Sequence, residues 1–182
     1  MKKYEMKALL AGAIHPAKLC RVFLTYDRNY RYYFPLKISD RLFLGAEEDD
    51  FILDGYSIRR FRDVEKIEIK DDKCLEIDRA EGLLDQLVTP DVDLTDWRSV
   101  FASLDKISCH IIIQRERLDE ENELFAIGRI MRVMSRHVLL KHFDADGNWQ
   151  EECWAIPYSQ ITSVTFGSRY VEVFSKYLPP IS

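Results

Sequence analysis

Short runs of alternating apolar and polar residues dominate the chain, and they predict mainly β structure. The longest run covers residues 30–38. Five side chains of this run share one face of the expected strand: Tyr30, Tyr32, Phe34, Leu36 and Ile38. Pro35 falls on the opposite face. Because proline has no backbone N–H to donate, it predicts a sheet edge or a bulge at this point.

The order of these patterns in the first half of the chain returns in the second half. CRVFL at 20–24 has a counterpart in CHIII at 109–113. Further counterparts are residues 41–44 with 137–140, residues 56–58 with 154–156, and Val64 with Ile161. We interpret the pattern as an internal repeat of structural elements with few identical residues.

Each half also ends in a pattern that is typical of a β-hairpin. In the first half, residues 67–69 and 75–77 alternate on either side of a polar turn. In the second half, residues 164–166 and 171–173 alternate around Gly167-Ser168-Arg169. We therefore expect a two-stranded hairpin at each of these places.

Short helices are expected before each β-rich stretch. The first covers residues 3–14 and ends at His15-Pro16, since the residue before proline avoids the helical region. The second begins after Asp93 as N-cap. Its buried stripe is predicted to be Leu94, Trp97, Val100, Phe101 and Leu104. A third helical piece at 80–87 and a linker turn at 89–91 place a domain boundary near residue 90, giving domains 1–90 and 91–182.

A short helix followed by about five bent strands resembles the Sm-like barrel, one of the SH3-like small barrels. The resemblance implies two tandem barrels, each preceded by a short helix. Asp144 and Asn148 have the spacing of an aspartate and an asparagine in the family's first motif, with Gly147 where the family has a bulky apolar residue. The Arg-Gly step of the second motif is absent at 57–60 and at 155–158. The resemblance therefore extends to the fold, and not to the family's ring assembly or RNA site.

Charge and composition narrow the class of protein. The net charge is −5, whereas a nucleic-acid binder usually has a strongly basic face. No apolar run approaches the ~20 residues of a membrane helix, and Glu5 and Lys7 interrupt the apolar N-terminal stretch. We expect a cytoplasmic protein without membrane contact. The four cysteines form no C-x-x-C pair and have apolar or alternating neighbours, which predicts buried thiols.

The segment FDADGNW at 143–149 raises the question of a calcium loop. Neither register places the required ligands: with Gly147 in the sixth position, His142 and Cys153 fall at positions one and twelve. A tight turn is favoured, with a positive φ at or beside Gly147 and with Asp144 and Asp146 exposed. We find no motif for a catalytic residue, a metal or a cofactor, and expect a non-enzymatic protein without cofactors.

Two binding functions stay open. The first is an adaptor that contacts a protein partner or its own copies through exposed aromatic residues and sheet edges. The alternative is RNA or single-stranded nucleic-acid binding through a basic-aromatic patch on the first barrel, where rings stack on bases beside cationic side chains. The residues of that patch are Arg31, Tyr33, Lys37, Arg59, Arg60 and Arg62.

Overall fold

A computed structural model of the protein describes residues 2–27, 29–108, 110–117 and 123–181. Its strands are β1 (Cys20–Leu24), β2 (Tyr30–Ile38), β3 (Leu42–Asp49), β4 (Ile52–Arg60), β5 (Val64–Ile69), β6 (Ile111–Arg115), β7 (Leu124–Val133), β8 (His137–His142), β9 (Trp154–Pro157) and β10 (Ser163–Phe166). Its helices are α1 (Lys3–Gly12), α2 (Lys73–Ala80), α3 (Trp97–Ile107) and α4 (Arg169–Ser175), with 3₁₀ turns η1 (Phe61–Asp63), η2 (Leu84–Gln86) and η4 (Tyr158–Gln160).

The ten strands form one antiparallel sheet in the order β5-β1-β2-β3-β4-β10-β6-β7-β8-β9. Within each half, the last strand in sequence lies beside the first, so the relative order is the same in both halves. No pairing among the described residues closes the sheet on itself. The expected fold class, mainly β with short helices, is confirmed at this level.

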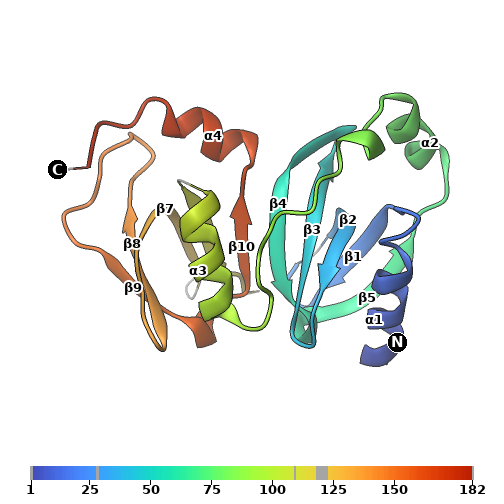
Figure 1. The fold of residues 1–182 in the computed structure, drawn as a ribbon, viewed down its shortest axis with the longest axis horizontal. Coiled ribbons are helices and arrows are strands. Elements are labelled where there is room, and N and C mark those ends of the chain that lie inside the picture. Colours follow the sequence, from blue (N-terminus) through green and yellow to red (C-terminus); the bar gives the residue numbers. More distant parts are fainter. Residues whose placement is uncertain (1, 28, 109, 118–122, 182) are drawn as a thin grey trace.

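The two halves lie side by side and are joined by β4 and β10 (Figure 1). Ser163 pairs with Arg59, and Phe166 pairs with Tyr56. One buried cluster of the first half contains Leu10, Val22 and Phe43. The large cluster of the second half, around Phe101 of α3, also includes Leu44 and Ile58 from the first half. The joint is therefore both hydrogen-bonded and packed.

Both predicted hairpins are wrong, because the segment after the last strand of each half is helical. After β5, Asp72 caps α2 by accepting a hydrogen bond from the Cys74 amide. After β10, Ser168 caps α4 by accepting one from Val171. A capping side chain satisfies an amide that has no partner in the first turn, so it stabilises the helix start. Alternation over three residues does not outweigh that signal.

The other predicted helices are partly correct. The first ends at Gly12, two residues before the predicted end. The second begins at Trp97 with Asp96 as its N-cap, while Asp93 accepts hydrogen bonds from Thr95 instead. Four of its five predicted stripe residues, from Trp97 to Leu104, are buried within the helix, and Leu94 is buried just before it. The third piece is displaced: residues 73–80 are α-helical and only Leu84–Gln86 forms a turn of 3₁₀ helix.

Pro35 lies at a bulge, as predicted. β2 pairs with β1 on one side and β3 on the other, and the register with β3 shifts between Pro35 and Lys37. The prediction for the cysteines is wrong in part: Cys20 is buried, whereas Cys74 and Cys153 are exposed at the start of α2 and in the loop before β9. Cys109 lies outside the described residues. None of the helices in the described part of the chain has the length and apolar character that a membrane crossing requires.

Candidate functional site: a cationic groove between the two halves

The six residues of the predicted basic-aromatic patch do not share one surface. Tyr33 and Arg59 are completely buried. Lys37 donates a hydrogen bond from Nζ to the carbonyl of Val92, 2.8 Å away, in the segment that links the two halves. Arg31 pairs with Asp27, with 3.0 Å between Nε and Oδ2. Arg60 and Arg62 alone among the six line the main groove.

Arg59 instead belongs to a buried polar network that spans the joint. Its Nε donates to the Tyr33 hydroxyl at 2.6 Å, and its Nη1 donates to both carboxylate oxygens of Glu116, at 3.1 and 2.9 Å. Glu116 follows β6, so this ion pair connects the first half to the second. The same carboxylate accepts hydrogen bonds from Thr162 and Ser163.

Arg59 and Glu116 each stabilise the charged form of the other. Burial alone would raise the pKa of Glu116, but the Arg59 guanidinium outweighs it and leaves that pKa below its usual range. Burial likewise opposes the charge on Arg59, while Tyr33 and Glu116 raise its pKa overall. Arg59 Nη2 has no hydrogen-bond partner among the described residues. A buried pair of this kind is costly to break, because one charge is then left without compensation.

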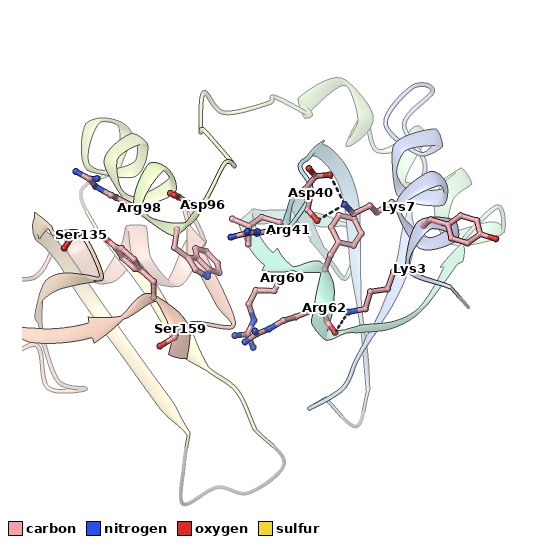
Figure 2. Close-up of a pocket in the computed structure, with 15 residues that line it drawn as sticks. Lys3, Lys7, Asp40, Arg41, Arg60, Arg62, Asp96, Arg98, Ser135 and Ser159 are labelled. Atoms are coloured by element: carbon pink, nitrogen blue, oxygen red, sulfur yellow. Dashed lines mark hydrogen bonds and ion pairs between the residues drawn. The ribbon is translucent and has the colours of Figure 1, made fainter.

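The main groove of the molecule lies between the two halves and encloses about 860 Å³. Figure 2 shows its labelled side chains: Lys3, Lys7, Arg41, Arg60 and Arg62 come from the first half, and Arg98 and Ser159 come from the second. α1, the β2–β3 turn, η1, the start of α3 and η4 all contribute to the wall. The groove therefore exists only when both halves are in place.

The groove is cationic, although the protein as a whole is acidic. It has six basic side chains: Lys3, Lys7, Arg41, Arg60, Arg62 and Arg98. Its two carboxylates, Asp40 and Asp96, are already engaged. Lys7 contacts Asp40 at 3.3 Å, and Asp96 caps α3 by accepting from the Ser99 amide at 2.8 Å.

The basic groups of the groove differ in how far nearby carboxylates neutralise them. Arg60 is neutralised by Asp63, with Nε and Oδ2 2.5 Å apart. Arg62 is 3.7 Å from the same carboxylate and its side chain is 63% exposed. Arg41 and Arg98 form no ion pair within the described part of the chain. Cationic groups around a concave surface raise the local concentration of anions, so the groove is suited to an anionic ligand.

Aromatic rings form part of the same wall. Tyr4 is 65% exposed at the rim, while Trp97 is mostly buried. Tyr158 stacks on Phe101 with ring centroids 5.8 Å apart, and its hydroxyl donates to the Met134 carbonyl at 2.8 Å. Of the groove's rings, Tyr4 is therefore the exposed one, with its hydroxyl donating to Glu5 at 3.2 Å, and the others give the wall a fixed shape.

Residues 143–149 form the tight turn that the sequence predicts. Gly147 has a φ of +81°, and Asp146 is exposed. Asp144 is half-buried rather than exposed, because its Oδ1 accepts hydrogen bonds from the amides of Asp146 and Asn148, at 3.0 and 2.9 Å. The Asn148 amide and its neighbours lower the pKa of Asp144. The carboxylate thus stabilises the turn together with two backbone hydrogen bonds, from the Asp144 amide to the Asn148 carbonyl and from the Gly147 amide to the Asp144 carbonyl.

Most of the groove was not predicted from the sequence. Lys3 and Lys7 are four residues apart on a predicted helix, which places them on one face and is the available local signal. Arg41 is brought beside Arg60 by the pairing of β3 with β4, and Arg98 reaches the same groove from the second half, which the joint between β4 and β10 holds in place. Comparison with protein-family models, with curated proteins and with solved structures returns no match to this chain.

Proposed function

We propose that the protein is a non-enzymatic binding module, and that the cationic groove binds single-stranded nucleic acid. The observation that carries this proposal is the charge of the groove in a protein of net charge −5. Of its six basic side chains, Lys7 and Arg60 are paired with Asp40 and Asp63, which leaves the other four for a ligand: Lys3, Arg41, Arg62 and Arg98. Four of the six are arginines. A guanidinium forms two parallel hydrogen bonds with a phosphate or with a carboxylate, so the arginines suit an anionic ligand, and it is the rings of the groove that favour a nucleic acid over an acidic peptide.

The rings support a single strand over a duplex. Tyr4 is exposed and follows Lys3 in α1, so a base of a strand that contacts the lysine with a phosphate could stack on the Tyr4 ring. In a duplex the faces of the bases are covered by their neighbours and are not free for such stacking. The groove thus combines the two features by which small domains hold single strands: cationic groups for the backbone and rings for the bases.

Fluorescence anisotropy with a labelled oligouridylate of about 12 nucleotides tests this function. We expect saturable binding at low salt. If about four phosphates are neutralised, by Lys3, Arg41, Arg62 and Arg98, the plot of log affinity against log salt has a slope of about −3. Arg41→Glu should weaken binding about fivefold or more, because it replaces an attractive charge by a repulsive one.

Arg79→Glu is the matched control for Arg41→Glu. Arg79 is exposed in the last turn of α2, forms no ion pair in the described part of the chain and does not line the groove. The same change of charge there should leave the affinity within error of the wild type. Absence of binding at low salt, or equal losses for the two variants, would sink the proposal.

We also propose that the two halves, residues 1–90 and 91–182, are tandem units of the Sm-like kind. The support is the common strand order, in which the fifth strand of each half lies beside the first. Each fifth strand also follows a 3₁₀ turn. A crystal structure in which the two halves superpose strand for strand would support this proposal, and one in which they do not would contradict it.

Contact with a protein partner or with further copies of the chain is the second proposed function. Its specific support is that β5 and β9 each have a strand on one side only among the described residues, and that Trp154 on β9 is 39% exposed. An unpaired edge can accept a strand from another chain. Light scattering separates the two cases: a mass above that of one chain would support further copies, and the mass of one chain would leave a different protein as the partner.

A further inference from the structure

The cationic groove adjoins a second hollow on the protein surface. A second, smaller basin of about 370 Å³ shares Arg60, Arg62 and Ser159 with it. These three side chains project toward the same region in Figure 2, with Arg60 and Arg62 coming from the first half and Ser159 from the second. The two hollows are therefore neighbours across one shared boundary.

The second basin is also cationic. Beyond the shared arginines it is lined by Arg115 and Arg117. Its two carboxylates are engaged: Asp63 contacts Arg60 at 2.5 Å, and Glu116 contacts Arg59 at 2.9 Å. An anionic chain that extends from the first groove past Arg62 would therefore remain next to positively charged side chains.

The two basins differ in what else they offer a ligand. The first has an exposed ring, Tyr4, and three rings that are more buried, Phe61, Trp97 and Tyr158. In the second, the ring present is that of Tyr26, whose hydroxyl accepts a hydrogen bond from Arg59 at 3.5 Å. Thr25, Ser159 and Gln160 supply hydroxyl and amide groups instead. Such groups bind phosphates and sugars, whereas stacking on bases requires an exposed ring face.

From these observations we propose that both basins form one continuous site for an extended strand. Bases are held in the first basin, and the sugar–phosphate backbone continues across Arg60 and Arg62 into the second, where base identity is not read. The inference rests on the proposed function of the groove and adds a path for the strand and a division of roles along that path.

The test compares oligouridylates of about 4 and about 12 nucleotides on the wild type, Arg41→Glu and Arg117→Glu. Arg41→Glu should weaken both ligands. Arg117→Glu should weaken the longer ligand about fivefold and leave the shorter one unchanged, because only the longer strand reaches the second basin. A 12-mer with abasic sugars in one half should keep its affinity for one of the two placements, 5′ or 3′, and lose it for the other.

The outcomes separate this inference from the function on which it rests. If neither oligonucleotide binds, the proposed function itself fails. Equal affinities for the short and long strands, or an Arg117→Glu variant that binds the long strand like the wild type, would overturn the second basin while leaving the first intact. Equal binding of polyglutamate would show that the path accepts any polyanion, and would overturn the assignment to nucleic acid. Arg79→Glu again serves as the control.

Discussion

Arg59 has no exposed surface, and its charge is balanced from the other half of the molecule by Glu116. Glu116→Gln keeps the size of the side chain and removes its charge, so a buried guanidinium is left uncompensated. We expect the free energy of unfolding to fall by about 3 kcal/mol, as measured by urea denaturation. Glu68→Gln, at the more exposed pair with Arg21, is the control and should cause no resolvable change.

The same residue gives the stability a pH dependence. The pKa of Glu116 is lower in the folded protein than in the unfolded chain, so its contribution is fully present above the unfolded value of about 4.3. It is lost as the pH falls through the folded value. The loss of stability on acidification should therefore be smaller in Glu116→Gln than in the wild type. Parallel pH profiles for the two proteins would contradict this assignment.

Arg59 also shows what sequence cannot supply at this scale. Within Ser57-Ile58-Arg59-Arg60, nothing local distinguishes the buried arginine from the one that reaches the groove. Its partner is 57 residues away. The predicted patch grouped basic and aromatic residues by their closeness in sequence. Contacts across the joint between the two halves determine which of them are buried and which charges are compensated.

At the scale of elements, the strands were the predictable part. Apolar patterns marked part of most strands, and proline marked the bulge in β2, because both effects act within a few residues. The helices after β5 and β10 were missed for a related reason. Leu75 and Ile77 alternate as a strand would, but in α2 it is Leu75 and Asp78, one helical turn apart, that are buried. Periodicity over so short a run fits either structure.

The joint between β4 and α4 depends on the absence of a side chain at Gly55. Its φ is +75°, and an added Cβ would lie 2.5 Å from the Ser168 amide nitrogen. Gly55→Ala should lower the free energy of unfolding by about 2 kcal/mol or more, since strain and clash add. Gly82 has the same φ with nothing within 4 Å of the added atom, so Gly82→Ala measures the backbone cost alone. The joint would not be tightly packed at Gly55 if the two variants lost equal stability in urea denaturation.

At the scale of the whole molecule, the internal joint is a template for the binding of a second copy of the chain. In that arrangement, β9 of one copy would lie beside β5 of the other, as β4 lies beside β10 within one chain. Positions in the two halves can be matched through the pairing. Phe43 pairs with Arg59, Val138 pairs with Ile156, and a 3₁₀ turn begins two residues after each second partner. Ile156 thus takes the place of Arg59, and the buried ion pair of the internal joint has no equivalent at the outer edge.

The residues that flank the outer edges oppose such an addition. By the same matching, Glu151 and Glu152 stand where Asp54 and Gly55 stand at the internal joint. Asp71 and Asp72 are the second and third residues after β5, and Ser168 and Arg169 have the same positions after β10. At the internal joint the Arg169 amide donates to the Asp54 carboxylate at 2.6 Å, and Gly55 leaves room for the Ser168 backbone.

A head-to-tail pair of chains would bring four carboxylates together and would put a glutamate side chain where only glycine fits. Like charges at an interface cost several kcal/mol, so they exclude a partner that strand pairing alone would admit. We therefore expect light scattering to give the mass of one chain, 21.5 kDa, at neutral pH. The variant Glu151→Lys/Glu152→Gly should shift the mass upward, because it removes both the repulsion and the steric block. If the wild-type protein already forms a dimer or a ring through β5 and β9, the two edges are compatible with each other. Self-association, part of the second proposed function, would then be favoured over a monomer with one groove.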